Sequence, residues 1–521
     1  VGSCSAPSRP ASRVNQVLML PMLRESGLSF NSQLVNTGIQ MTVSIATRAL
    51  DSELVARELG NWRTSSRSGP TYQGLADGLR MLIVDGRLPV GSRLPSERAL
   101  ADALRVSRTT VTAAYNGLRD DGYLYARRGA RSTIALPHAP TPAADDAAAT
   151  INLAVAALSA PASAVQEAFA EAARQSAAYL QHTGHDMKGL PALRTAIAER
   201  YCARGLPTSA EQIMVTSGAQ HALALVMATY TKSGDRVLVE QPTYHGALTA
   251  IATAGARAVP VPVSNEGWDL EALHTAVRQV APTLAYLVPD NHNPTGMSLP
   301  AADRDRLCDI ISETRTRTVI DETLTDVWLD EPVPAPVAAS MRGRADLLIT
   351  VGSMSKSFWG GMRIGWIRAE PGVLATIRAI RPSIDLGTSV VEQLAAAWLL
   401  TERADDVLPE RREILRARRD QLIDLLAHRL PEWRPLPGTG GMSLWVQLPA
   451  PVSSAMCASA SRLGVELPPG PRFGVDGTLE RFVRIPYVLP EEKLTEAVEL
   501  IARAWHSVTG SATPQTTAVV I

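Results

Sequence analysis

The chain has 521 residues, of which 45% are hydrophobic and 20% charged, and its formal net charge is zero. Its length predicts several globular domains, its zero net charge excludes a chain that is basic throughout, and the absence of any apolar span of about 18 residues excludes a predicted transmembrane helix. The four cysteines, which have neither metal-ligand nor paired spacing, suit a reducing, cytoplasmic compartment and predict no metal site.

The first forty residues mix Ser, Pro, Asn and Gln with isolated apolar residues and show no sustained period. We expect them to be disordered, or to precede an alternative start at Met41. A weak amphipathic pattern in Leu54, Val55 and Leu59, followed by Trp62, indicates a short helix after them. We therefore treat residues 1–70 as an N-terminal extension.

The block from 71 to 135 differs in charge from the whole chain, because it contains ten Arg, no Lys and only six Asp plus Glu. A local positive excess is what the phosphate backbone of a nucleic acid selects. Apolar spacing predicts a helix that ends near Gly86, a second helix capped by Ser96, and a third capped by Ser107. The third helix carries Arg108 in its first turn and small polar residues on its outer face, so it can enter a DNA major groove.

Residues 122–126 and 131–135 read as two strands around a basic tip, which predicts a hairpin, or wing. A three-helix subdomain with Arg on its solvated face is a common alternative, so periodicity alone leaves DNA binding open. The run RLPSERALADALRVSRTTVTAAYNGLRDDGYL, however, resembles the winged helix-turn-helix of the GntR family. This resemblance implies DNA contacts from Arg98, Ser107, Arg108, Thr109, Thr110, Thr112, Arg128 and Gly129. Arg108 is the best candidate for a bidentate base contact.

Residues 136–150 are dominated by Pro and Ala, so we expect a semi-extended linker. Beyond it, Asn293, Asp321 and Lys356 each follow a strand-like apolar run. Taken singly, these residues have plainer readings as a turn, a helix cap and a solvated loop. Ligands of open α/β sheets lie at the C-terminal ends of strands, and an amide, a carboxylate and an imine-forming amine there are what a pyridine aldehyde needs.

The loop around Lys356 supplies further groups for a phosphorylated aldehyde. Ser353 and Ser355 bring two hydroxyls to a tight turn, and Arg363 follows in a glycine-rich stretch. The lysine could form a Schiff base with a cofactor such as pyridoxal phosphate (PLP), while Arg363 and the serine hydroxyls take the phosphate.

Together these residues resemble the fold-type I PLP-dependent aminotransferases, from Ile151 to Gly510, with residues 511–521 as a tail. The resemblance implies a mostly parallel α/β sheet divided into large and small subdomains. It assigns Lys356 to the Schiff base, Asp321 to the pyridine nitrogen, Asn293 to the ring 3-oxygen, and Arg484 to a substrate or effector carboxylate. The other implied cofactor-binding residues are Gly218, Ala219, Gln220, Tyr244, Ser353, Ser355 and Arg363. A surface ion pair is the plainer reading of Arg484.

The sequence departs from the family at one point. Many members carry a Tyr shortly after the cofactor Asp that also bonds the ring 3-oxygen, whereas Thr323 and Leu324 stand here. This puts efficient transamination in doubt, because the donor that tunes the imine is absent.

A GntR-like reader, a linker and an aminotransferase-like domain, in this order, resemble the MocR subfamily of bacterial regulators. This resemblance implies a homodimer whose PLP or amino-compound ligand changes binding to double-stranded operator DNA. We expect a PLP-dependent transcriptional regulator. The alternatives are an active aminotransferase with an accessory DNA-binding domain and a dimerisation platform without cofactor.

Overall fold

The computed structural model describes residues 49–60, 62, 71–85, 87–88, 92–120, 123–125, 132–134, 150–436, 438–475 and 477–510. The predictions made for the first forty residues, for most of the 136–150 linker, for Arg128 and Gly129 at the wing tip, and for the 511–521 tail fall outside these residues. No helix in the described ranges combines the length and apolar character that a membrane crossing requires.

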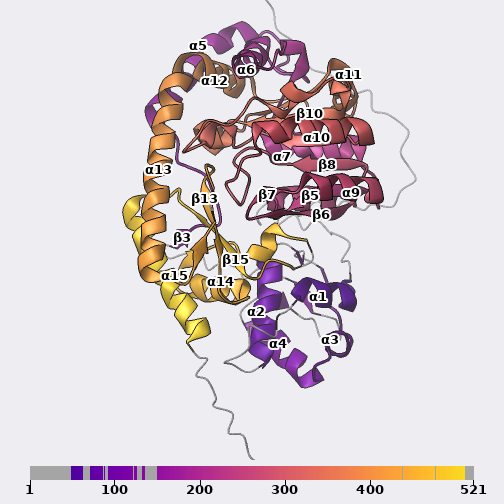
Figure 1. Cartoon of the computed structure of the whole chain (residues 1–521), viewed down its shortest axis with the longest axis vertical. Helices are drawn as coiled ribbons and strands as arrows, with labels where there is room; N and C mark the ends of the chain where they lie inside the picture. The colour runs from indigo at the N-terminus through magenta and orange to yellow at the C-terminus, as the bar shows by residue number, and fades with distance from the viewer. Residues whose placement is uncertain are drawn as a thin grey trace, which may run out of the picture. The chain divides into compact units, whose positions relative to one another are not determined.

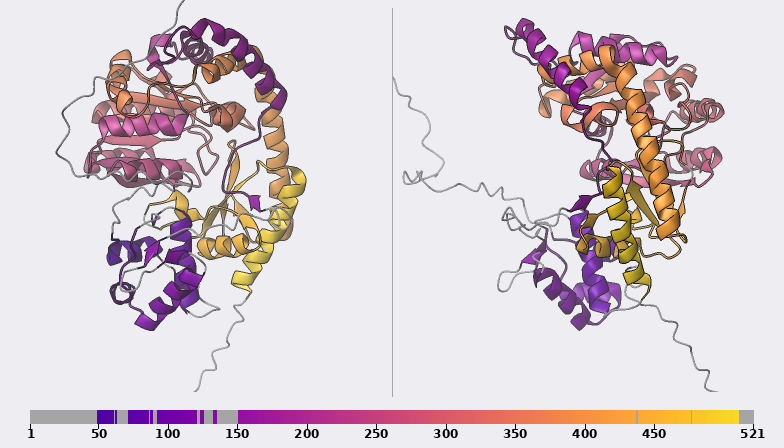
Figure 2. Two further views of the ribbon diagram at one scale, coloured as in Figure 1. Left: turned by 180° about the vertical axis from the view of Figure 1, so that it is seen from behind. Right: turned by 90° about the vertical axis from the view of Figure 1, so that its left-hand side faces the viewer.

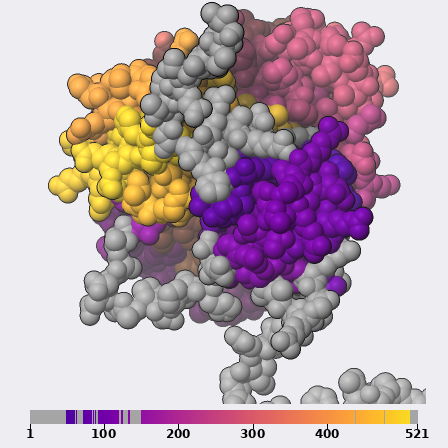
Figure 3. Space-filling model, turned by 90° about the horizontal axis from the view of Figure 1, so that it is seen from below, coloured from indigo at the N-terminus to yellow at the C-terminus, as the bar shows by residue number. Residues whose placement is uncertain are grey.

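The N-terminal domain is a small helical bundle with a two-stranded hairpin, and it forms one compact lobe (Figure 3, indigo). Its elements are α1 (Ser52–Leu59), α2 (Thr71–Val84), α3 (Glu97–Leu104), α4 (Arg108–Asp120), β1 (Leu124–Tyr125) and β2 (Thr133–Ile134). The three helices predicted after residue 71 are confirmed as α2, α3 and α4. The Ser96 hydroxyl caps α3 by accepting the Ala99 N–H at 3.2 Å, as its position predicted.

Helix α1 belongs to this folded domain, although it lies in the segment that we assigned to an N-terminal extension. Asp51 caps it by accepting the Glu53 N–H at 2.9 Å, and Val55 is fully buried in the same hydrophobic cluster as Leu100 and Val111. The short helix expected around Leu54 to Trp62 is therefore confirmed, and the folded block begins earlier than residue 71. Two turns of helix gain stability only by packing on neighbours, which a local pattern does not reveal.

The large subdomain is built on an eight-stranded sheet with the strand order β4-β11-β10-β9-β8-β5-β6-β7 (Figure 1). The pairs that join β5, β6, β8, β9 and β10 are parallel, while β11 runs antiparallel to both of its neighbours and β7 antiparallel to β6. The strands are β4 (Ile213–Thr216), β5 (Arg236–Gln241), β6 (Arg257–Ser264), β7 (Gly267–Trp268), β8 (Leu284–Leu287), β9 (Thr318–Asp321), β10 (Leu348–Ser353) and β11 (Gly365–Arg368). This mostly parallel sheet confirms the predicted α/β class.

Helices cover both faces of the sheet, as a buried parallel sheet requires. One face packs against α7, α8 and α11, and the other against α9 and α10. Their bounds are α7 (Ala219–Tyr230), α8 (His245–Thr253), α9 (Leu270–Val280), α10 (Ala301–Thr314) and α11 (Pro371–Ile380). A further cluster brings together α5 (Ala162–Ser176), α6 (Pro191–Ala203) and α12 (Val390–Trp398).

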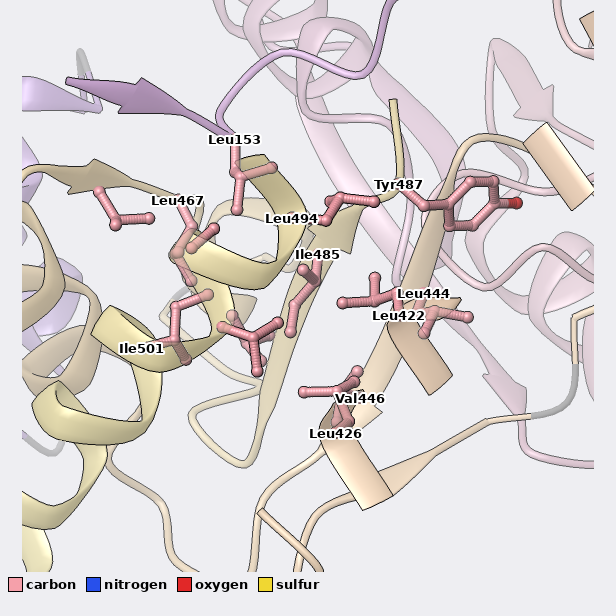
Figure 4. Close-up of a cluster of buried hydrophobic side chains, with 14 of the residues drawn as sticks. Leu153, Leu422, Leu426, Leu444, Val446, Leu467, Ile485, Tyr487, Leu494 and Ile501 are labelled. Atoms are coloured by element: carbon pink, nitrogen blue, oxygen red, sulfur yellow. The ribbon is translucent and has the colours of Figure 1, made fainter. Parts of the chain in front are cut away.

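The small subdomain packs a three-stranded antiparallel sheet against long helices. Leu422 and Leu426 of α13 meet Leu444 and Ile485 of the sheet in the core that Figure 4 shows. In both views of Figure 2, α13 (orange) runs beside α15 (yellow). The elements are β3 (Ile151–Asn152), α13 (Ala404–Arg429), β12 (Arg434–Pro435), β13 (Ser443–Gln447), α14 (Ser453–Arg462), β14 (Val465–Glu466), β15 (Phe482–Pro486) and α15 (Glu491–Thr509).

The sheet topology explains why polar residues from distant parts of the chain meet. Strands β8, β9 and β10 are adjacent and parallel, so their C-terminal ends lie along one edge of the sheet. Asn293 follows β8, Asp321 ends β9, and Lys356 follows β10. This edge is where the sequence predicted a ligand site.

Candidate functional site

A cavity of about 430 Å³ lies at this edge of the sheet. Every residue that the sequence predicted for the cofactor and the effector lines it. These residues are Gly218, Ala219, Gln220, Tyr244, Asn293, Asp321, Ser353, Ser355, Lys356, Arg363 and Arg484. The structure therefore brings the predicted set together in one place, while the role of each residue remains a prediction.

Lys356 lies in the turn that directly follows β10, with its amine inside the cavity. Its Nζ donates a hydrogen bond to the Ala156 carbonyl at 2.6 Å. Burial, together with the positive charge of Arg484 and against the charge of Asp321, lowers the pKa of Lys356 from 10.5 to about 8. A lysine with this pKa has a substantial neutral fraction near physiological pH, which is the form that attacks an aldehyde.

Asp321 presents a buried carboxylate from the last residue of β9. Its Oδ1 accepts the Thr323 N–H at 2.8 Å and its Oδ2 accepts the Tyr286 hydroxyl at 2.6 Å. Burial raises the pKa of Asp321 despite these donors. Since a buried carboxylate is stabilised most by a cation, this position fits the protonated ring nitrogen of PLP.

The part of the cavity formed by Gly218 and Arg363 is suited to an anion. Gly218, at φ 97°, precedes the first turn of α7, and no side chain caps that helix. The Arg363 Nη2 donates to the Ser217 carbonyl at 2.7 Å and lies 2.9 Å from where a Cβ on Gly218 would stand. Backbone N–H groups at a helix N-terminus, next to a guanidinium, form a cradle that fits the cofactor phosphate.

The two serines of the lysine loop occupy different positions. Ser353 is almost fully buried and its Oγ donates to the Ile364 carbonyl at 3.2 Å, so this hydroxyl holds the turn. Ser355 is half-buried, and its Oγ lies 3.0 Å from that of Ser353. Of the two hydroxyls, that of Ser355 is the freer to reach a phosphate.

Arg484 projects from β15 and is only 2% exposed, so the alternative of a surface ion pair is wrong. Its Nη2 donates to the Ala154 carbonyl at 2.7 Å, its Nη1 to the Asn293 side chain at 3.4 Å, and its Nε has no hydrogen-bond partner among the described residues. Burial and the neighbouring Arg472 lower the pKa of Arg484 to about 9. A buried, incompletely paired guanidinium fits a ligand carboxylate.

Tyr286, His245 and Arg472 are among the cavity residues that escaped the sequence prediction. Tyr286 lies within β8, in a run that indicates only a buried strand. His245 follows the predicted Tyr244, and burial with three nearby cations lowers its pKa to about 3, so its ring is neutral. Arg472 stands in a Pro- and Gly-rich loop that carries no motif.

The missing ring-oxygen tyrosine has a visible consequence at Thr323. This threonine lines the cavity, and its buried Oγ1 makes no hydrogen bond of normal geometry to a described residue, although it lies near enough to Asp321 to lower the pKa of that carboxyl. A buried hydroxyl of this kind is normally satisfied by a neighbour or a ligand. Thr323 can therefore offer a donor to a bound group, although a shorter one than tyrosine.

The candidate DNA-binding residues cluster at the start of α4. Arg98, Ser107, Arg108 and Thr109 are exposed, and the Arg108 side chain is 72% accessible. The Ser107 Oγ caps α4 by accepting the Thr110 N–H at 3.1 Å. Thr110 and Thr112 are half-buried.

Thr112 is the predicted DNA contact that the structure supports least. Its Oγ1 donates to the Glu97 carboxylate at 2.8 Å, which ties α4 to α3. The same carboxylate lies 3.7 Å from the Arg108 guanidinium. Glu97 therefore positions the first turn of α4, whose exposed Arg and Thr side chains form a surface suited to a groove.

Two family models match the chain. The model for aminotransferase class I and II matches residues 148–501, and the model for bacterial regulatory proteins of the gntR family matches residues 71–134. The chain is 30% identical over 442 residues to the HTH-type transcriptional regulator YdcR of Escherichia coli, which covers 79% of this chain and 94% of that protein. It is 28% identical over 395 residues to the probable rhizopine catabolism regulatory protein MocR of Rhizobium meliloti, covering 70% and 78% respectively.

Solved aminotransferases share the fold of the larger domain. LysN, the α-aminoadipate aminotransferase of Thermus thermophilus, matches with a TM-score of 0.64 and 27% identity over 69% of this chain and 93% of that chain. Its structure holds N-(5'-phosphopyridoxyl)-L-leucine, a pyridoxyl group joined to an amino acid.

Proposed function

Because this chain belongs to the class I and II aminotransferase family and joins that domain to a GntR-type DNA-binding domain, as MocR-type regulators do, we propose that it senses PLP or an amino compound and changes its binding to operator DNA accordingly. The observation that carries this proposal is the presence, in one chain, of an exposed Arg108 on a capped helix and a buried Lys356 in a cavity lined by the residues predicted to bind PLP.

Pyridoxal phosphate is the cofactor that fits the fold and the cavity residues of this domain. When bound, it supplies an aldehyde that reacts with primary amines and a ring that withdraws electrons. The protein's part is to hold it: Asp321 would face the ring nitrogen, the Gly218 cradle and Arg363 would hold the phosphate, and Lys356 would carry the covalent attachment. Arg484 would orient a carboxylate of the effector.

Sensing requires that the ligand favours one of two arrangements of the chain, because equal affinity for both would shift nothing. The segment that follows the linker can differ between two such arrangements, because it is bonded to residues of the cavity. Lys356 and Arg484 both donate hydrogen bonds to carbonyls of this segment, at Ala156 and Ala154. A ligand that engages the lysine and the arginine competes with these bonds and so alters how the segment is held.

Footprinting on the DNA upstream of the gene tests the proposal directly. We expect a discrete protected site whose affinity falls with rising salt, since phosphate contacts release counterions, and whose occupancy changes when PLP or an amino compound is added. Protection that is unaffected by PLP and by a panel of amino acids and amines would contradict sensing.

Arg484→Ala tests the effector end of the site separately. The variant should retain PLP, because the arginine is assigned to the effector carboxylate and not to the cofactor, and should lose the response to carboxylate effectors. A DNA-binding response that survives the substitution would show that Arg484 is structural. Arg481→Ala is the matched control, since this exposed arginine precedes the same strand and bonds the Pro449 carbonyl outside the cavity.

A homodimer in the cytoplasm is the proposed form of the protein. The class I and II aminotransferase architecture and a reader of paired half-sites both favour a two-fold assembly. Exposed apolar side chains at Leu180 (80%) and Leu386 (50%) are consistent with a covered surface. A monomeric mass in light scattering at micromolar concentration would contradict this part of the proposal.

An active aminotransferase with an accessory DNA-binding domain is the second candidate. It is favoured by the complete set of Asn293, Asp321, Lys356 and Arg484 in one cavity, which a working enzyme would keep. Turnover of an amino donor with a keto acid at roughly 1 per second or more would support it. Only slow turnover, with specific DNA binding, would support the regulator.

A further inference from the structure

Arg472 is a cation that lines the cavity. Among the described residues, it is the lining cation to which neither the cofactor nor a single ligand carboxylate has been assigned. It belongs to the short turn Gly470–Phe473 ahead of β15, and its side chain is 27% accessible. Arg472 lines the same cavity as Arg484 and His245, and its charge lowers the pKa of both.

The charges around the cavity favour a ligand with an additional negative group. Within the described part of the chain, four cations line it, Lys356, Arg363, Arg472 and Arg484, against one carboxylate, Asp321. The proposed cofactor phosphate takes Arg363, its ring nitrogen takes Asp321, and an α-carboxylate takes Arg484. A guanidinium left over in a partly desolvated cavity attracts a further anion.

Arg472 has a counter-ion in the protein, but the pair is loose. Its Nη1 lies 3.8 Å from the carboxylate of Asp85, at the end of α2, which exceeds hydrogen-bond length. Burial raises the pKa of Asp85 to about 6, against the charges of Arg472 and Arg87. Because the pair has no hydrogen bond, a ligand carboxylate within hydrogen-bond distance of the guanidinium can displace Asp85.

His245 is a second cavity residue with an unused hydrogen-bonding atom. It lines the cavity beside Tyr244, and its buried Nδ1 has no hydrogen-bond partner among the described residues. A neutral imidazole can donate one hydrogen bond to a carboxylate oxygen.

We propose that the effector is an amino acid with a second carboxylate on its side chain, which Arg472 binds while Arg484 binds the first. The inference rests on the proposed sensing function and specifies its ligand class. It makes Arg472 a specificity-determining residue, and it makes binding of the acidic ligand compete with the Arg472–Asp85 contact at the DNA-binding domain.

The test uses full-length holoprotein and matched ligand pairs. L-glutamate is compared with L-glutamine, and L-aspartate with L-asparagine, by the change in cofactor absorbance on titration. We expect at least one acid to bind about 10-fold or more tightly than its amide, the difference expected for a hydrogen bond between charged groups. Arg472→Gln should remove this preference and barely change the affinity for the amide.

Further variants separate ligand binding from a structural role. Arg472→Lys keeps the charge and should keep part of the preference, and Arg481→Gln should keep all of it. Asp85→Asn removes the competing carboxylate, so it should tighten the acid and leave the amide unchanged. The cofactor absorbance of each variant before titration reports whether the site has formed.

The outcomes distinguish this inference from the proposed function. Equal affinity for acids and amides, or a preference that persists in Arg472→Gln, overturns the inference and leaves amino-compound sensing intact. If neither PLP nor any amino acid or amine alters the DNA binding of the wild-type protein, the proposed function fails as well.

Discussion

Tyr286→Phe removes one hydroxyl from the floor of the cavity and provides a sharp test of how Asp321 is held. Tyr286 is fully buried, and its hydroxyl donates to the Asp321 Oδ2 at 2.6 Å. Burial and the neighbouring carboxylate raise the pKa of Tyr286 well above 10, so the hydroxyl keeps its proton and acts as donor. Without it, the ionised Asp321 loses its hydrogen bond from Tyr286 and keeps the backbone N–H of Thr323, with the Thr323 hydroxyl nearby.

The expected loss of PLP affinity can be worked out from the charge of the hydrogen-bond acceptor, the Asp321 carboxylate. A hydrogen bond to a charged group contributes about 1.5–3 kcal/mol, which corresponds to roughly a 10- to 150-fold change in an equilibrium constant. Because burial already raises the pKa of Asp321, the substitution favours the neutral acid further. The neutral acid is a poor partner for a protonated ring nitrogen, so the affinity for PLP should fall by this factor.

Equilibrium titration of the apoprotein with PLP, followed by absorbance, measures the effect. Tyr487→Phe is the matched control, since that buried hydroxyl donates to the neutral carbonyl of Gly440 at 3.3 Å. The control should lower thermal stability modestly and leave PLP affinity unchanged. If Tyr286→Phe binds PLP as tightly as the wild type, the ionised form of Asp321 does not depend on this donor and the reasoning is refuted.

The remaining predictions concern the lysine and the DNA-binding helix. Lys356→Ala should keep the fold but lose the cofactor that stays bound through denaturation, and a retained covalent chromophore would contradict its assignment. Because the pKa of Lys356 is lowered to about 8, its amine is mostly protonated below that pH. The rate of PLP uptake should therefore rise from about pH 6 and level off above about pH 9. A rise centred near pH 10.5 would indicate an exposed lysine. Arg108→Ala should weaken specific DNA binding by about 1–3 kcal/mol in a gel-shift titration without altering the cofactor spectrum, so a changed spectrum would argue against separate sites. Ser107→Ala removes the cap of α4 and should cost about 1 kcal/mol of stability in urea unfolding of the N-terminal domain signal, and an unchanged midpoint would show that the cap is dispensable.

The sequence predicts which residues meet at this edge of the sheet, because the sheet topology does most of the positioning. Adjacent parallel strands bring their C-terminal ends together, so Asn293, Asp321 and Lys356 meet once each follows its own strand. The starts of two helices in the DNA-binding domain are also predictable from neighbouring residues, because Ser96 and Ser107 mark where α3 and α4 begin. Signals of this kind need no knowledge of distant contacts.

Some residues line the cavity only because their side chains point toward it. The sequence pattern does not predict these residues. Tyr286 is hidden in a uniformly apolar strand, where alternation does not say which face meets Asp321. Arg472 reaches the cavity from a loop near the end of the chain, and no short-range pattern relates it to Arg484. The packing of α1 against α3 was missed for the same reason, since only tertiary contacts make that short helix part of the domain.

A ligand that switches DNA binding must bind one arrangement of the chain much more tightly than the other, and the Arg472 contact alone is too weak to supply that difference. Shifting a two-state equilibrium from 1:99 to 99:1 takes about 5.5 kcal/mol of differential binding, whereas exchanging the Arg472 partner contributes only a fraction of that. The carbonyls of Ala154 and Ala156 supply further differential contacts, because Arg484 and Lys356 donate hydrogen bonds to them. These residues directly follow the segment that links the two domains, so a ligand that takes both the arginine and the lysine would release it. Coupling built from several modest exchanges predicts that single substitutions at this segment weaken the DNA-binding response without abolishing it.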